Sequence, residues 1–237
     1  MSTPVQLRRH PGFVRLTHWL TTIAFLALLV SGIEVLLSHP RFYWGETGNV
    51  EETPLFIIPV PASRSTVPTG YGYVLPDQNG WSRYLHFQSA WLLAFTGLAY
   101  LVAGVRSGHF RRDLLPASAE LRWPPVRNAI VRHLRFPAAS VADPSSYNLL
   151  QRIAYLLVIF GLVPLVIWTG LAMSPGFTAI WPSTVTLVGG KQSARTLHFV
   201  ISVALTVFLF VHLAMLVLAG FTARVRAMIT GRAEVRP

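Results

Sequence analysis

Four histidines lie inside long apolar segments, where ionisable side chains are costly and usually face a packed interior or a cofactor. They are His18, His86, His198 and His212. A neutral imidazole binds metals through one ring nitrogen while the other nitrogen makes a hydrogen bond. A single histidine of this kind could be an ordinary core residue. Four in matched positions indicate that the chain holds a metal-containing cofactor.

Two of these histidines, His198 and His212, share one apolar segment and are fourteen residues apart. At 3.6 residues per helical turn, fourteen steps return a side chain to within roughly 40° of its starting direction, and the rise is about 21 Å. One helix face therefore presents imidazoles at two depths, one near each membrane surface. That spacing leaves room for two haems stacked across a bilayer.

The depth of each histidine in its segment predicts its partner. His18 and His212 lie toward one membrane surface, and His86 and His198 lie toward the other. Two imidazoles fill both axial positions of a haem iron, which favours electron transfer over oxygen activation. Zinc fits less well, because it prefers three or four clustered ligands. The chain has no cysteine, which excludes thiolate-bound clusters and c-type haem.

The elements that must position these histidines are predicted from composition. Of the 237 residues, 52% are hydrophobic and 12% are charged, and the charged fraction is about half that of soluble domains. Four segments are long enough to cross a bilayer, which takes about 20 residues. The sequence therefore predicts an all-α integral membrane protein, a four-helix bundle forming one domain over residues 1–237. The expected helices are about 16–37, 83–106, 150–173 and 195–220, joined by an outer loop at 38–82 and a cytoplasmic loop at 107–149.

Basic residues predict the orientation of these helices. The amino-terminal tail, the second connection and the carboxyl-terminal tail hold 15 of the 20 lysines and arginines. Cytoplasmic segments carry such an excess, so both termini are expected in the cytoplasm, with the chain in a bacterial inner membrane. The net charge of +11 then reflects orientation and attraction to membrane lipid rather than nucleic-acid binding. Glu34 and His39 follow the first segment in place of a small-residue cleavage site, so the first helix is expected to be retained.

Residues around the four histidines allow two interpretations each. Gly32 is expected on the same helix face as His18, and Gly97 on the same helix face as His86. The missing side chain at each glycine would let either a flat macrocycle or a neighbouring helix approach the backbone. Four basic residues flank the histidines and could either bind haem propionates or anchor the helices at the interface: Arg15, Arg83, Lys191 and Arg195.

Three further features lie away from this face. The outer loop at 38–82 is either an irregular cap or a docking surface for an extracytoplasmic partner, since long loops are often functional. Pro164 is expected to kink the third helix, and Glu34 is expected to be an interfacial carboxylate. The remaining histidines are expected to face solvent or lipid headgroups: His10, His39, His109 and His133.

The histidine arrangement and two short stretches resemble a known family. The stretches are Tyr147–Arg152 (YNLLQR) and Gly189–His198 (GGKQSARTLH). The chain resembles the dihaem cytochrome b subunits of respiratory molybdoenzymes, which include the formate dehydrogenase gamma subunit and bacterial cytochrome b561-type subunits. The two stretches are most similar to the thiosulfate reductase cytochrome b subunit. The outer loop here is much longer than in the formate dehydrogenase subunit.

This resemblance implies two b-type haems in a single membrane cytochrome b domain. The haem between His18 and His212 would lie on the cytoplasmic side, and the haem between His86 and His198 on the outer side. The resemblance also implies an exported molybdopterin oxidoreductase as partner, and electron exchange with quinone or quinol in the membrane. No motif in this sequence matches a quinone site.

We therefore expect a membrane electron-transfer subunit of an oxidoreductase complex. One alternative is a stand-alone transmembrane haem reductase, which would use the same haems to reduce an external acceptor. Another is a non-redox membrane protein such as a transporter. Transporters tend to contain internal repeats, and none is evident in this sequence.

Overall fold

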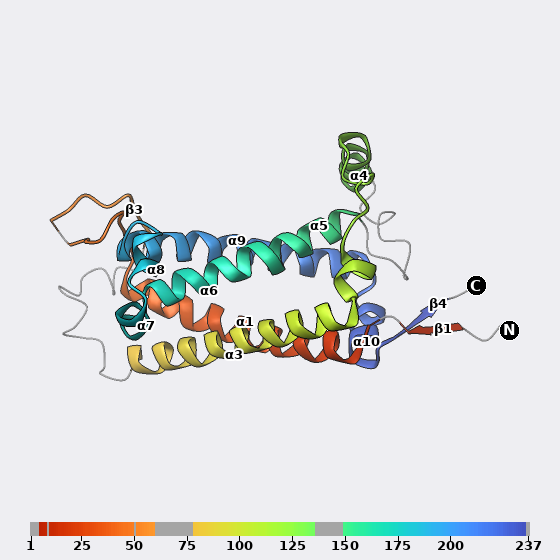
Figure 1. Ribbon diagram of the computed structural model, residues 1–237, viewed down its shortest axis with the longest axis horizontal. Coiled ribbons are helices and arrows are strands. Elements are labelled where there is room, and N and C mark those ends of the chain that lie inside the picture. The colour runs from red at the N-terminus through yellow and green to blue at the C-terminus, as the bar shows by residue number, and fades with distance from the viewer. Residues whose placement is uncertain (1–4, 9, 50, 60–77, 136–148, 236–237) are drawn as a thin grey trace. The chain divides into compact units, whose positions relative to one another are not determined.

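The computed structural model describes residues 5–8, 10–49, 51–59, 78–135 and 149–235. Four helical segments in this part of the chain are long and apolar enough to cross a membrane. The expected helix ends lie within a few residues of the observed bounds, so the predicted all-α membrane fold is confirmed. The segments (Figure 1) are α1 (Gly12–Ser38), α3 (Gln78–Ser107), the joined elements α5 (Leu149–Leu157), η3 (Val158–Leu162) and α6 (Val163–Ala172), and α9 (Lys191–Leu218).

Short elements occupy the connections between the spans. Two antiparallel strand pairs join β1 (Val5–Arg8) to β4 (Arg232–Val235) and β2 (Arg41–Phe42) to β3 (Phe56–Ile57). The short helices are η1 (Phe110–Leu114), α4 (Trp123–Arg135), α7 (Pro175–Ile180), α8 (Ser183–Thr186) and α10 (Phe221–Thr230). The predicted loops at 38–82 and 107–149 include residues 60–77 and 136–148, which lie outside the described residues.

The third span is irregular near Pro164, the residue at which the sequence predicts a kink. A π-helical turn, η3, occupies Val158–Leu162, and Pro164 follows it as the second residue of α6. Proline lacks an amide hydrogen, and its ring clashes with the carbonyl group four residues earlier, here that of Phe160. A wider π turn at this point lets the helix continue through the proline.

The chain forms two compact units, and each is described by itself. Unit 1 comprises Met1–Trp19, Thr96–Gly161 and Val207–Pro237, and unit 2 comprises Leu20–Phe95 and Leu162–Thr206. Each of the four spans contributes one part to unit 1 and the other part to unit 2. Unit 1 therefore contains His18 and His212, and unit 2 contains His86 and His198.

In unit 2, the connection after α1 is anchored to the start of α9. The first amide groups of a helix have no partner within the helix, and here Gln192 and Ser193 both donate to the Gly45 carbonyl oxygen, over 3.0 and 3.2 Å. The Gly45 amide donates in return to Ser193 Oγ over 2.8 Å. This approach requires glycine at position 190, because a Cβ there would lie 2.6 Å from the Glu46 amide nitrogen. These bonds, which we call the Gly45 clamp, fix the start of the helix that carries His198.

The outward faces of the spans carry large exposed apolar side chains. Examples are Ile23 on α1, Phe95 on α3 and Phe210 on α9, each more than half exposed. Contiguous apolar surface of this kind is unusual on soluble proteins and is what lipid contact requires. The chain is a multi-pass membrane protein.

Candidate cofactor site

In unit 2, His86 on α3 faces His198 on α9. Their ring centroids are 6.2 Å apart and their planes meet at 61°. The two rings are therefore close without stacking on one another. The sequence placed these two histidines at the same depth, and the structure brings them together.

In unit 1, His18 on α1 faces His212 on α9. Their ring centroids are 6.5 Å apart and their planes meet at 51°. Phe208 lies one helical turn before His212 and stacks on it, with centroids 5.9 Å apart and planes 23° apart. Tyr155 on α5 approaches the same imidazole by an edge, with centroids 6.4 Å apart. Aromatic side chains thus pack against His212, and the sequence alone did not predict these contacts.

The separation within each pair suits one metal ion between two imidazoles. A metal–imidazole bond is about 2.0 Å long and the ring centre lies about 1.2 Å beyond the nitrogen, so two rings on one ion lie roughly 6.4 Å apart. The observed separations of 6.2 and 6.5 Å match that value. The described residues contain no group of three or more histidine, cysteine, aspartate or glutamate residues placed to hold a metal. Two axial imidazoles are what a haem iron takes from a protein, whereas a protein zinc site needs a larger cluster.

The Nδ1 atoms of the pair in unit 2 contact buried hydroxyl groups. Ser31 Oγ on α1 lies 3.0 Å from His86 Nδ1, and Thr169 Oγ1 on α6 lies 3.1 Å from His198 Nδ1. The carbonyl oxygen of Val166 lies 3.1 Å from the same His198 nitrogen. A ring held through Nδ1 has its Nε2 left for a metal.

Glycines bring two helices close to the same two rings. A Cβ on Gly32 of α1 would lie 3.5 Å from His86 Cε1, and a Cβ on Gly170 of α6 would lie 3.5 Å from His198 Cε1. Gly97 in unit 1 differs, because a Cβ there would meet no atom within 4 Å. The open space at Gly97 fits the approach of a flat macrocycle, whereas Gly32 is in ordinary contact with an imidazole.

Three of the four flanking basic residues have partners within the described residues. Arg15 donates to the Ile229 carbonyl oxygen over 2.6 Å. Arg195 donates to the His39 and Arg41 carbonyl oxygens over 2.5 and 2.7 Å. Lys191 lies 3.9 Å from a Glu46 carboxylate oxygen, with both side chains more than half exposed. Arg83 is exposed. Arg195 therefore anchors the connection after α1, and propionate binding by these four residues stays a prediction.

Comparison with known proteins places the chain in a family. A model of the prokaryotic cytochrome b561 family matches residues 9–231. The chain belongs to that family. A cytochrome b561 of this kind is a membrane haem protein that transfers electrons, so the expected cytochrome b fold and electron transport are confirmed. The family also excludes the non-redox alternative.

One similar protein comes from Azospira oryzae and is named "Putative protein-methionine-sulfoxide reductase subunit YedZ1". It is 33% identical over 222 residues, which cover 94% of this cytochrome b561 chain and 96% of that protein. No solved structure matches the chain. The alignment covers all four spans, so the two proteins are similar over the whole membrane domain.

Two of the histidines outside the spans contradict the expectation that they face solvent. His10 and His109 are 7% and 4% exposed. His39 is exposed, yet partial desolvation of its ring lowers its pKa, and the positive charge of Arg195 lowers the pKa further. The side chain of His133 lies outside the described residues. His109 is buried because its ring lies against Phe13, Tyr100 and Phe110, and hydropathy alone does not reveal these contacts.

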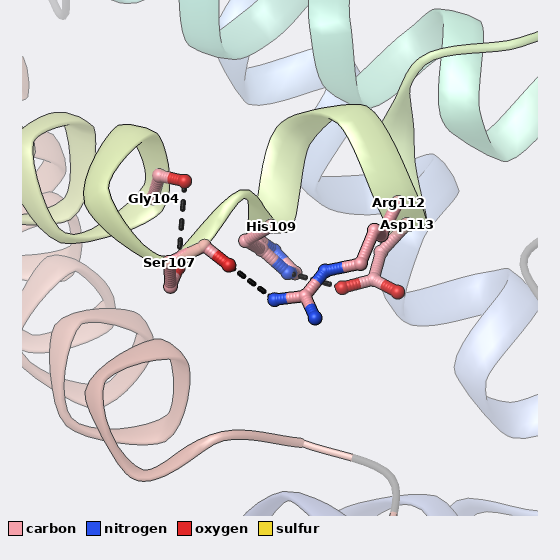
Figure 2. A network of polar contacts seen from close by, with 5 residues as sticks. All are labelled: Gly104, Ser107, His109, Arg112 and Asp113. Carbon is pink, nitrogen blue, oxygen red and sulfur yellow. Dashed lines mark hydrogen bonds and ion pairs between the residues drawn. The ribbon is translucent and has the colours of Figure 1, made fainter.

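His109 lies in a group of polar contacts in unit 1 (Figure 2). Its Nδ1 lies 2.6 Å from Asp113 Oδ2, and the Asp113 side chain is 47% exposed. Arg112 donates to the Ser107 carbonyl oxygen in the same turn. The His109 ring is enclosed by aromatic side chains, with ring centroids between 5.6 and 6.1 Å away: Phe13, Tyr100 and Phe110. A buried imidazole is thus joined to a carboxylate that reaches solvent.

Proposed function

We propose that this cytochrome b561 carries electrons through two b-type haems, one held by His18 and His212 and the other by His86 and His198. The observation that supports this assignment is the separation of the rings in each pair, which matches two imidazoles on one metal ion. When bound, haem b supplies an iron that accepts and releases one electron. Two imidazoles at each iron leave no position for oxygen, so these residues favour electron transfer.

The residues of this chain have distinct roles in the proposal. The four imidazoles would hold the two irons, and α9 would contribute one ligand to each. Gly97 leaves the space that a macrocycle needs. Arg15 and Arg195 hold chain connections through carbonyl oxygens, and Arg83 and Lys191, which are more exposed, are better placed to meet propionates.

We further propose that electrons pass from membrane quinol to an exported oxidoreductase, which the family resemblance suggests is a molybdopterin enzyme. The relative from Azospira oryzae supports this direction, because its name makes it a subunit of a reductase that acts on methionine sulfoxide in proteins. Reduction of a sulfoxide consumes two electrons and two protons and releases water. The excess of basic residues on one side supports cytoplasmic termini and a bacterial inner membrane.

Oxidation of a quinol also needs a proton acceptor, and the His109–Asp113 pair supplies one. A quinol releases two protons with its two electrons. His109 is buried among aromatic rings in unit 1, which also contains the His18–His212 pair, and Asp113 is half exposed. A proton taken up by His109 can therefore reach water through the Asp113 carboxylate.

Haem counting tests the proposal. The purified protein is expected to contain two b-type haems per chain in a pyridine haemochrome assay, and His86→Ala or His18→Ala is expected to lose one. His39→Ala is the matched control, because His39 lies outside both pairs and should leave both haems in place. A protein purified from haem-replete cells with no haem, or a His86→Ala variant with full haem content, would contradict the assignment. Co-purification of a second protein would separate an electron-transfer subunit from the stand-alone reductase.

A further inference from the structure

We propose that the hydroxyl groups of Ser31 and Thr169 fix the tautomer of His86 and His198 and lower the reduction potential of the haem that these two histidines hold. The inference rests on the proposed function, since it takes the two imidazoles as iron ligands. It assigns positioning roles to two residues on helices α1 and α6. Neither residue would itself touch the iron.

The Ser31 hydroxyl is placed to donate its hydrogen to its own helix. Ser31 Oγ lies 2.7 Å from the Ala27 carbonyl oxygen and 3.2 Å from the Leu28 carbonyl oxygen. Carbonyl oxygens only accept, and a hydroxyl has one hydrogen to donate. Toward His86 the Ser31 oxygen can therefore offer only a lone pair. With the hydroxyl donating to its own helix, the hydrogen between the two residues belongs to His86 Nδ1.

Thr169 makes the same arrangement at His198. Its Oγ1 lies 2.9 Å from the Leu165 carbonyl oxygen and 3.1 Å from that of Val166. The Val166 carbonyl oxygen also lies 3.1 Å from His198 Nδ1, and a carbonyl can only accept. Two acceptors thus face this nitrogen, which must carry the hydrogen.

Burial makes the assignment costly to reverse. Ser31 is fully buried and Thr169 is 2% exposed. A lone pair on either Nδ1 would face acceptor oxygens away from water, and an unmade hydrogen bond at such a site is expensive. Both rings are therefore held with hydrogen on Nδ1 and a lone pair on Nε2, which is the form that binds a metal.

The same hydrogen bonds affect the electron affinity of a bound iron. An imidazole that donates from Nδ1 to an oxygen acceptor becomes a stronger electron donor at Nε2. Stronger donation stabilises the oxidised iron more than the reduced iron, so it lowers the reduction potential. Hydrogen bonding by residues beyond the ligands is one of the known ways in which a protein tunes haem.

Thr17 provides a matched comparison in the same chain. Its Oγ1 lies 2.8 Å from the Phe13 carbonyl oxygen and 3.2 Å from that of Val14, the pattern that Thr169 makes on α6. Thr17 is also buried, and it precedes the ligand His18. Its hydroxyl group bonds carbonyl oxygens of its own helix, so Thr17→Val removes a similar hydroxyl without removing an acceptor from His86 or His198.

The test is a spectroscopic redox titration of the purified haem-containing protein. Thr169→Val and Ser31→Ala are each expected to favour reduction of one haem by up to about tenfold, which is a shift of about +59 mV for a one-electron couple. Thr17→Val should leave that haem unchanged, and Thr169→Ser should restore it. The same shift is expected in a His18→Ala background, which would retain only the haem concerned.

Two results would overturn the inference. One is a reduction potential of this haem that does not change in Thr169→Val or Ser31→Ala, or that Thr17→Val shifts as much as they do. The other is loss of haem in Thr169→Val that Thr169→Ser does not restore, which would make the residue a packing element. A wild-type protein without haem would instead contradict the proposed function, so the two failures are distinguishable.

Discussion

Substitution of Gly190 by alanine is expected to break the Gly45 clamp and loosen the start of α9. Gly190 has a φ of +109°, and left-handed backbone costs a residue with a Cβ about 1–2 kcal/mol. The new Cβ would also lie 2.6 Å from the Glu46 amide nitrogen, so the backbone around Gly45 must move away. Three hydrogen bonds would be lost with it, each contributing about 0.5–1.5 kcal/mol. The total cost of Gly190→Ala is therefore roughly 3–6 kcal/mol.

Gly45→Ala is the matched control for this prediction. Gly45 has a φ of +107°, but a Cβ there would meet no atom within 4 Å, so only the backbone cost of about 1–2 kcal/mol applies. Thermal unfolding of both variants in one detergent, followed by circular dichroism, should show a much larger loss for Gly190→Ala. Haem absorbance should show that the pair containing His198 is affected first. Equal losses in the two variants would refute the reasoning, because they would show that the clamp contributes nothing.

Two further predictions concern polar side chains next to the spans. His109→Gln and Asp113→Asn are each expected to slow quinol oxidation by roughly a hundredfold, because a proton acceptor is lost, and to leave the haem content unchanged. Glu120→Gln changes another carboxylate of the same connection and should have no effect. Full activity in Asp113→Asn would contradict the proton path. Arg195→Met should lower the free energy of unfolding by about 1.5–3 kcal/mol, because charge-assisted hydrogen bonds are lost. Lys191→Met should lower it by less than about 1 kcal/mol, because the ion pair of Lys191 is exposed. Equal melting temperatures for the two variants would show that Arg195 does not anchor the connection after α1.

The parts of the fold that could be predicted from sequence are those with a local cause. Each span is a run of apolar residues long enough to cross a bilayer, and its length and charged ends are visible in the chain itself. The fourteen-residue spacing of His198 and His212 is likewise a property of one helix. The irregularity at Pro164 follows from the chemistry of proline. The structure has four spans at the expected positions and a π turn just before Pro164.

The partners of these residues could not be predicted, because they depend on which helix faces meet. Ser31 lies 55 residues before His86, and Thr169 lies 29 residues before His198, with no local pattern that joins them. The third span has no histidine, so nothing in its residues predicts that Thr169 and Gly170 lie beside His198. A hydroxyl that bonds its own helix is common in membrane helices, and only the packing shows which hydroxyls also meet an imidazole.

The burial of His109 has a similar explanation. Its position just after the second span suggested an interfacial side chain, but a turn at Gly108, with a φ of +69°, directs the chain into η1 and against Phe13 near the start of α1. A histidine followed four residues later by an aspartate on a helical turn is the one local signal that could have indicated the pair. The contacts with Phe13 and Tyr100 could not be read from it.

The most direct test of the central claim compares haem content in two double variants. His86→Ala/His198→Ala removes both ligands of one proposed haem, so the purified protein should retain one haem per chain, as each single variant should. His18→Ala/His198→Ala removes one ligand from each proposed haem and should retain none. Retention of one haem by the second double variant, or loss of both haems in the first, would contradict the pairing of His18 with His212 and of His86 with His198.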